Sequence, residues 1–274
     1  MENIFKIACV QTEPKPDFES ALTDIFSLSN QAINEGAKFI ALPEYCGGLK
    51  TENGMLRPPS SIEEDHIVLN ELKKYSKKNK VFILIGSIAI LNSEGKIFNR
   101  SFIIDDDGNI ISRYDKVHLF DVDLSETEKY RESNAVSGGQ NVSVTKTKFG
   151  ILGQTVCYDI RFPYLYRELS HAGAEIIFIP AVFTQKTGEA HWHVLNRARA
   201  IENGVFIISP GAIGSIQGGG GGYGHSLVVN PWGEIISDAG GKRGVSFANI
   251  DLEEVQLVRN KIPSLTHDKN IILS

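Results

Sequence analysis

Three residues that could act together in covalent chemistry end apolar runs of the sequence: Glu44 in ALPEY, Lys116 in SRYDK and Cys157 in QTVCYD. A cysteine thiol has a pKa of about 8.5, so nucleophilic attack at neutral pH needs a positioned base and a nearby positive charge. Glutamate and lysine can supply both. Spacing alone leaves open whether the three side chains meet. It also leaves open whether Cys157 is instead a small buried hydrophobe, as free cysteines often are.

The elements predicted around these residues are typical of a layered α/β protein, in which functional groups gather where buried strands give way to loops. Apolar runs predict strands over 5–14, 37–45, 81–91, 149–159 and 174–183, and within 97–116, 205–214, 225–240 and 244–263. Apolar spacing predicts helices over 20–36, 70–80, 162–173 and 190–204. Segments 34–45 and 171–183 both place Gly-Ala before a buried strand that stops at proline. This echo predicts two related layers around a shared core.

Composition and charge exclude several classes of protein. The chain has 274 residues, of which 42% are hydrophobic, so it can bury a sizeable core as one large domain or two small ones. A net charge of -5 and a pI of about 5.8 provide no diffuse positive field for nucleic acid or anionic lipid. The early apolar stretch IFKIACVQ is too short for a signal segment, and no later run approaches membrane-spanning length. We therefore expect a cytoplasmic protein that binds neither nucleic acid nor membrane.

The sequence gives no support for a disulfide, metal or phosphate site. Cys9, Cys46 and Cys157 form neither an even set nor a CxxC pair, so free thiols are expected. The aspartates of 105–109 are predicted to form a solvated hairpin turn. The run Gly218–Gly222 lacks the strand-loop-helix context and the Lys-Ser pair of a phosphate cradle, so it predicts a flexible surface loop.

Two other cysteine chemistries fit the sequence less well. A cysteine phosphatase needs a C-x5-R loop opening a helix, whereas Arg161 follows Cys157 after three intervening residues and Pro163 comes soon afterwards. A papain-like or class I glutaminase site would pair Cys157 with a histidine. The strained G-x-C-x-G elbow of such sites is absent from TVCYD, which leaves this reading as a distant alternative.

Five motifs in order carry a resemblance: ALPEY, YDKVHLFD, CYDIRFP, GEAHWHVLNRARAIENGVFI and GHSLVVNPWGEI. Together they resemble the nitrilase, or carbon-nitrogen hydrolase, superfamily, and within it the Nit-type omega-amidases and deaminated-glutathione amidases. The similarity runs from the first strand to about residue 250. It implies a four-layer α-β-β-α sandwich, formed as a single domain over 1–274, that needs no cofactor and no metal. It also implies a homodimer, with a C-terminal extension from about 255 in the interface.

The resemblance assigns roles to the residues in these motifs. It makes Cys157 the nucleophile, Glu44 the general base and then acid, and Lys116 the cation that stabilises the oxyanion with the backbone N–H of Tyr158. The implied reaction splits a small amide into acid and ammonia through a thioester. Glu132 in KYRES matches a second glutamate that orients the family's site, although a solvated loop carboxylate is an equal alternative at that position.

Substrate-binding residues are also implied by the resemblance. Arg161 matches an arginine that holds a substrate carboxylate in Nit-type relatives, with a structural ion pair as its alternative role. Phe183 and Thr184 of AVFT are implied to line the pocket, while for Trp192 and His193 a role as core and interface residues is an equal alternative.

The substrate itself stays open at this stage. YCGGLKTENG after Glu44, and the glycine-rich GSIQGGGGGYGHS, differ from the segments of close Nit relatives. Nitrile hydrolysis and N-carbamoyl hydrolysis are the alternatives within the superfamily, and a pseudo-hydrolase binding subunit is the non-enzyme alternative. Cys46, two residues after Glu44, is either a second reactive thiol or a buried packing residue, and we expect the packing role.

Overall fold

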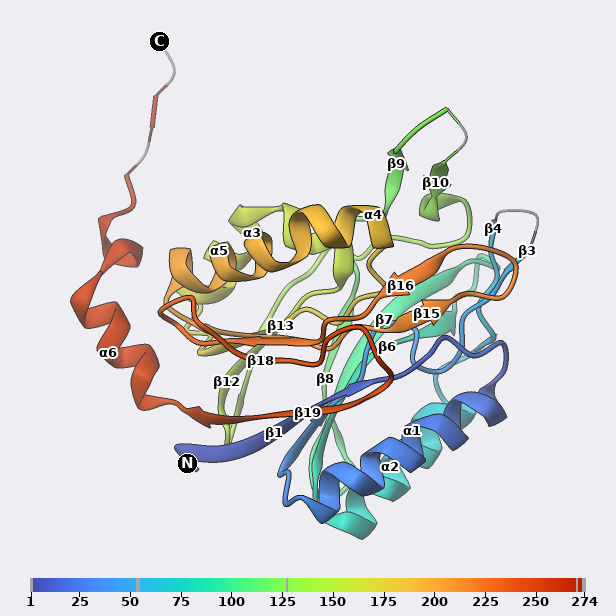
Figure 1. The fold of residues 1–274 in the computed structure, drawn as a ribbon, viewed down its shortest axis with the longest axis horizontal. Coiled ribbons are helices and arrows are strands. Elements are labelled where there is room, and N and C mark those ends of the chain that lie inside the picture. The colour runs from blue at the N-terminus through green and yellow to red at the C-terminus, as the bar shows by residue number, and fades with distance from the viewer. Residues whose placement is uncertain (1, 53–54, 127, 270, 273–274) are drawn as a thin grey trace.

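The computed structural model describes residues 2–52, 55–126, 128–269 and 271–272. Two β-sheets lie face to face in the middle of the molecule, and helices cover the outer face of each (Figure 1). Helices α1 (Phe18–Asn34) and α2 (Ile67–Asn79) cover the first sheet, whereas α3 (Pro163–His171) and α5 (His193–Asn203) cover the second. The predicted four-layer α-β-β-α sandwich is therefore confirmed.

The first sheet has the strand order β19-β1-β2-β6-β7-β8, with β5 also paired to β6. Its strands are β1 (Ile4–Gln11), β2 (Phe39–Ala41), β5 (Ser60–Ser61), β6 (Phe82–Leu91), β7 (Ile97–Ile104), β8 (Ile110–Asp115) and β19 (Gly244–Asp251). The second sheet has the order β11-β12-β13-β14-β17-β18. Its strands are β11 (Val144–Thr147), β12 (Gly150–Gln154), β13 (Ile176–Phe178), β14 (Phe206–Ser209), β17 (Leu227–Val229) and β18 (Ile235–Asp238).

The two sheets are built by the same succession of elements. In the first, β1, β2 and β6 are parallel and are linked through α1 and α2, with Cys9 opposite Ala41 and Ala41 opposite Leu84. In the second, β12, β13 and β14 are parallel and are linked through α3 and α5, with Phe178 opposite Ile208. Each parallel trio is followed by antiparallel strands. The echo between the two halves of the sequence thus corresponds to two related layers.

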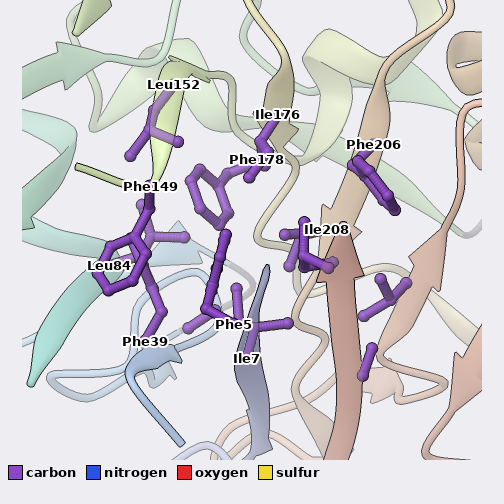
Figure 2. Close-up of a cluster of buried hydrophobic side chains, with 14 of the residues drawn as sticks. Phe5, Ile7, Phe39, Leu84, Phe149, Leu152, Ile176, Phe178, Phe206 and Ile208 are labelled. Atoms are coloured by element: carbon purple, nitrogen blue, oxygen red, sulfur yellow. The ribbon is translucent and has the colours of Figure 1, made fainter. Parts of the chain in front are cut away.

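The inner faces of the sheets share one apolar layer, which Figure 2 shows in close-up. Phe5, Ile7 and Phe39 reach it from the first sheet, and Phe178 and Ile208 reach it from the second. The rings of Phe39 and Phe178 stack with centroids 5.3 Å apart. Full burial of each such side chain contributes about 1.5–3 kcal/mol, so this layer holds the two sheets, and the loops at their ends, in a fixed relation.

Strand β1 explains why the buried strands lack an alternation of apolar and polar residues. Ile7 and Cys9 belong to the layer between the sheets, whereas Ala8 and Val10 pack under α1 and α2. Both faces of the strand are covered, so both sets of side chains are apolar.

The last predicted strand is partly wrong. Residues 244–251 form β19, but Glu253–Lys261 form a helix, α6. Acidic residues in its first turn, Glu253 and Glu254, and basic residues in its last, Arg259 and Lys261, suit the helix dipole at each end.

The prediction of a surface loop at the glycine run is also partly wrong. Gly218–Gly220 are exposed, but Gly221–Tyr223 form β16, which pairs with β15 (Ile213–Ser215). A Cβ at Gly218 would overlap the carbonyl oxygen of Thr51, so the absence of a side chain permits close contact there.

Two further hairpins project from the sandwich near the same end. They are β3 (Thr51–Glu52) with β4 (Met55–Leu56), and β9 (Asp121–Asp123) with β10 (Lys129–Arg131). Among the helices of the described residues, none is both long and apolar enough to cross a bilayer.

Candidate active site

Four ionisable side chains meet where strands of both sheets end. Glu44 follows β2, Lys116 follows β8, Glu132 opens a short 3-10 helix after β10, and Cys157 opens another after β12. The exposed fractions of the four residues are 4%, 2%, 9% and 7%. The structure therefore brings together the three residues singled out from strand ends, and it places Glu132 with them. The alternative of a solvated carboxylate at Glu132 is wrong.

Lys116 is the centre of the cluster. Its Nζ lies 3.0 Å from Oε1 of Glu44, and 3.1 and 2.9 Å from Oε1 and Oε2 of Glu132. Burial alone would lower the pKa of Lys116, but the carboxylates of Glu132 and Glu44 outweigh burial and raise the pKa well above its ordinary value. The two carboxylates thus favour the charged ammonium of Lys116 in spite of its burial.

Glu44 is fixed through both carboxylate oxygens. Its Oε2 accepts a hydrogen bond from the backbone N–H of Val182 at 2.7 Å, and its Oε1 accepts one from Asn99 Nδ2 at 2.9 Å. Asn99 Nδ2 also lies 3.3 Å from Glu132 Oε1. Sequence reasoning missed Asn99, whose only signal was a polar residue inside the apolar run IFNRSFII. Asn99 ties the two glutamates together and holds both in one orientation.

Cys157 lies on a strained turn. Strand β12 ends at Gln154, so Cys157 is not a strand residue as expected but the first residue of a 3-10 helix, Cys157–Arg161. Its φ is +49°, in the left-handed region that non-glycine residues seldom occupy, and its N–H donates to the carbonyl of Pro180 at 2.9 Å. The turn is therefore strained even though TVCYD lacks flanking glycines. Such strain persists only where surrounding contacts hold it.

Asp159 supplies those contacts from a fully buried position. Its carboxylate accepts hydrogen bonds from the N–H of Val156 at 2.8 Å, the hydroxyl of Tyr114 at 2.7 Å and the N–H of His118 at 3.0 Å. The ring Nδ1 of His118 lies 2.7 Å from the same carboxylate. These bonds tie the cysteine turn to the segment that carries Lys116, and the sequence reasoning did not find them.

The surroundings of Cys157 favour the protonated form of its thiol. Burial, and next the nearby Glu44 carboxylate, raise the pKa of this thiol well above its ordinary value, and Lys116 opposes them only in part. Attack by sulfur therefore requires a base that takes the thiol proton as the new bond to sulfur forms. Glu44, whose carboxylate interacts with the Cys157 thiol, can act as this base.

A cavity of about 330 Å³ opens in front of these residues, which suits a small molecule. Glu44, Lys116, Glu132 and Cys157 form its floor. Its walls combine apolar, aromatic, charged and backbone groups of residues 45, 49, 51, 56, 120, 128–131, 182–184, 187, 216 and 218–221. Gly218–Gly221 contribute backbone to this wall, a role that sequence analysis left open.

The predicted substrate-binding residues are placed differently from one another. Tyr158, Phe183 and Thr184 line the cavity, whereas Arg161 does not. The Arg161 guanidinium lies over the rings of Phe183 and Tyr158, with its carbon 5.4 and 5.9 Å from their centroids, and its NH1 and NH2 are each 3.3 Å from Nδ1 of His191. Among the described residues it forms no ion pair with an acidic side chain, so the alternative role of Arg161 gains no support.

Two cations missed by sequence reasoning line the cavity from β10. Arg131 pairs with Asp123 at 2.7 Å. For the side chain of Lys129, no hydrogen bond or ion pair is found within the described part of the chain, although its backbone lies in the pairing of β10 with β9. Lys129 is therefore the lining cation whose charge is available to a ligand.

The other two cysteines are packing residues. Cys9 is fully buried in the layer between the sheets, and Cys46 packs under α2. Burial raises the pKa of each thiol to about 12. Both are chemically inert near neutral pH, which confirms the packing role expected for Cys46.

Comparisons with known proteins point to one enzyme family. A family model described as "Carbon-nitrogen hydrolase" matches residues 6–260. The chain is 36% identical over 264 residues to a deaminated glutathione amidase of Synechocystis, covering 95% of this chain and 96% of that protein. It is 32% identical over 275 residues to omega-amidase NIT2 of Danio rerio, covering 98% and 96%. The crystal structure of Saccharomyces cerevisiae Nit3, a member of branch 10 of the nitrilase superfamily, superposes with a TM-score of 0.81 at 29% identity, covering 95% of this chain and 94% of that one.

Proposed function

The chain belongs to the carbon-nitrogen hydrolase family, and we propose that it hydrolyses small carboxylate-bearing amides to the acid and ammonia through a thioester on Cys157. The observation that carries this proposal is the buried contact of Lys116 with Glu44 and Glu132 beside the cysteine thiol, at the floor of a cavity sized for a small ligand.

Acylation starts from the resting state of this site. Glu44 accepts the proton of Cys157 as sulfur attacks the amide carbon, and the carbonyl oxygen gains the negative charge. The Lys116 ammonium and the N–H of Tyr158 stabilise that charge, because the first amides of a helix have no acceptor within the helix. Glu44 then gives its proton to the leaving nitrogen, ammonia departs, and the acyl group stays on sulfur as a thioester.

Deacylation uses the same groups. Glu44 takes a proton from a water molecule, and the hydroxide attacks the thioester carbon. The tetrahedral intermediate is again stabilised by Lys116 and the Tyr158 N–H. Its collapse releases the carboxylic acid, and the proton held by Glu44 returns to the sulfur of Cys157. Glu132 and Asn99 hold Lys116 and Glu44 in place throughout and do not take part in the bond changes.

The ammonium of Lys129 supports a substrate that carries a carboxylate, in a lining that also contains Glu128, whose Oε1 accepts the hydroxyl of Tyr130 at 3.1 Å. Lys129 offers an ammonium from β10, and Arg161 lies behind the rings of Phe183 and Tyr158, which form part of the wall. Two relatives with more than 30% identity are named deaminated glutathione amidase and omega-amidase, and both names describe amide hydrolysis.

The test is ammonia release from four substrate classes: omega-amides bearing a carboxylate, neutral amides of the same length, nitriles and N-carbamoyl compounds. We expect the wild type to prefer the first class. Cys157→Ala is expected to abolish release, whereas Cys46→Ala, a matched change of a nearby inert thiol, is expected to retain it. Release from nitriles or N-carbamoyl compounds in preference to amides would contradict the proposed reaction.

The carboxylate contact is tested by Lys129→Gln and Arg161→Gln, each measured on a carboxylate-bearing amide and on its neutral counterpart. An increase in KM of about tenfold, restricted to the charged amide, is expected where a contact with the carboxylate is lost. Arg131→Gln serves as the control, since its charge is already paired with Asp123. Equal KM values for charged and neutral amides in the wild type would contradict selection for a carboxylate.

We further propose a single catalytic domain over 1–274 that forms a homodimer in the cytoplasm, with the segment from about 255 in the interface. Leu257 and Ile262 of that segment are more than half exposed, which supports a covering partner surface. All three cysteines are free thiols, as in proteins of a reducing compartment. Sedimentation of the full chain at micromolar concentration is expected to show a dimer, and a monomer alone would contradict the proposal.

A further inference from the structure

Two histidines and an aspartate converge outside the catalytic cavity. His193 opens α5, His225 lies between β16 and β17, and Asp238 ends β18. His193 Nε2 is 3.1 Å from Asp238 Oδ2, and His225 Nδ1 is 3.0 Å from Oδ1 and 3.2 Å from Oδ2. One ligand atom from each residue lies within 4.8 Å of the others. We propose that these three side chains bind a divalent transition-metal ion of the zinc type.

The spacing of the donor atoms suits such an ion. Zinc binds imidazole nitrogen and carboxylate oxygen at about 2.0–2.2 Å, so two ligands at a tetrahedral angle lie roughly 3.4 Å apart. The nitrogen to oxygen distances of 3.0–3.2 Å are close to that value. A bound ion therefore requires only a small outward shift of each imidazole from the carboxylate, and the ligand nitrogens of the two imidazoles lie within 4.8 Å of one another. Two imidazole nitrogens and one carboxylate oxygen are ligands typical of zinc. Calcium and magnesium, by contrast, bind to sets of oxygen atoms.

The ligands are held in place before any ion arrives. The N–H of His225 donates to the carbonyl of Gly240 at 3.0 Å, and its ring stacks on Tyr223 with centroids 4.5 Å apart. Oδ1 of Asp238 accepts the N–H of Gly240 at 2.8 Å. Because the side chains already face one another, binding of an ion would cost little additional conformational entropy.

Solvent reaches this cluster, so an ion can enter and water can complete its coordination. The side chains of His193, His225 and Asp238 are 33%, 27% and 33% exposed. The competing interpretation is an aspartate clamped by two neutral imidazole N–H groups. A second histidine–aspartate pair serves as a comparison. His171 Nε2 lies 2.7 Å from Oδ2 of Asp268, and the other partner of that carboxylate is Arg167, not a second imidazole. That pair offers too few ligands for the same ion.

The site lies directly behind one wall of the catalytic cavity. The carbonyl of His225 accepts the indole N–H of Trp192 at 2.8 Å, and the Trp192 ring packs on Phe183 with centroids 4.8 Å apart. Tyr223, under the His225 ring, donates its N–H to the carbonyl of Phe183 at 2.8 Å. An ion would therefore join α5, the connection between β16 and β17, and β18 behind Phe183, and we expect it to stabilise this wall without taking part in the bond changes.

The test uses the full chain with any affinity tag removed and with Cys157→Ala in every sample, so that zinc cannot bind the catalytic thiol. After treatment with EDTA, the protein is titrated with ZnCl2 in a calorimeter. We expect one ion per chain and a rise in Tm on adding zinc. His225→Ala and Asp238→Asn are each expected to weaken binding by at least about tenfold and to remove the rise in Tm. His171→Ala is the matched control and is expected to bind as its parent does.

His193→Gln provides a second variant if His225→Ala does not fold, since glutamine keeps a polar side chain on the exposed face of α5. Saturable binding that survives both His193→Gln and Asp238→Asn would place the ion elsewhere and overturn the proposal. Absence of saturable zinc binding by the parent protein would overturn it as well, and would leave the aspartate clamp as the role of the cluster. Neither result depends on whether the amide hydrolysis proposed above is correct.

Discussion

His66 provides a prediction whose size follows from the structure. Its imidazole is fully buried at the start of α2, against the ring of Phe18 at 4.9 Å, and a Cβ on Gly47 would lie 3.7 Å from it. Within the described residues neither ring nitrogen has a hydrogen-bond partner. Burial lowers the pKa of His66 from 6.5 to about 4. Burial thus favours the neutral ring, and a charged ring lowers the stability of the fold.

The sign and size of the pH effect follow by linkage. The unfolded chain binds a proton at His66 below about pH 6.5, whereas the folded chain does so only below about 4. The stability contribution is therefore complete above pH 6.5 and is lost as the pH falls towards 4. Each pH unit between the two pKa values is worth about 1.4 kcal/mol. At pH 5, His66 alone should lower the free energy of unfolding by about 2 kcal/mol relative to pH 7.5.

The assay is urea unfolding of the wild type, His66→Leu and His267→Leu at pH 7.5 and pH 5, at one protein concentration. Leucine replaces a buried ring at position 66, and His267 is an exposed histidine that serves as the control. We expect the wild type and His267→Leu to lose about 2 kcal/mol more than His66→Leu between the two pH values. An equal loss in all three proteins would refute the assignment of a buried neutral imidazole.

Two further predictions concern the site. Glu44→Gln should lower the pKa of Cys157, because the neighbouring negative charge is gone, and should therefore speed alkylation of the thiol by iodoacetamide at pH 7. Ammonia release should fall by about 10²–10⁴-fold, because the general base is lost. Slower alkylation of the variant would contradict the predicted effect on the pKa. Gly86→Ala should lower both Tm and kcat/KM, because the new Cβ would overlap the carbonyl of Leu42 in the segment leading to Glu44. Gly241→Ala, whose Cβ meets no atom within 4 Å, is the matched control, and an equal effect of the two alanines would show that the overlap is relieved without cost.

The parts of the fold that sequence could predict are those governed by local pattern. The run 81–91 predicts a strand and corresponds to β6 (Phe82–Leu91), because a strand covered on both faces needs apolar residues throughout. The helix end that precedes 37–45 also matches, since the C′ glycine Gly36 has a φ of +82°. Helix α6, by contrast, begins two residues after the end of β19. Its acidic first turn and basic last turn indicate a helix, but the apolar run of β19 before it led to the prediction of one continuous strand.

Of the candidate site, only the residues at the ends of predicted strands could be identified from the sequence. Glu44 and Cys157 stand beyond the ends of parallel strands, and such ends are where functional side chains gather. Asn99 and Asp159 act through contacts with residues far away in sequence, and no local pattern encodes those contacts. The position of Arg161 over two rings depends likewise on how the segment that contains Phe183 packs against the cysteine turn, so the motif alone could not place its guanidinium.

The central claim is that Cys157 carries the acyl group during turnover. The most direct measurement is peptide mapping by mass spectrometry after acid quench of the wild type at saturating amide, with Cys46→Ala treated in parallel. We expect a mass increase equal to the acyl part of the substrate on the peptide that contains Cys157 in both proteins. An acyl group on any other residue, or turnover by Cys157→Ala at the wild-type rate, would contradict it.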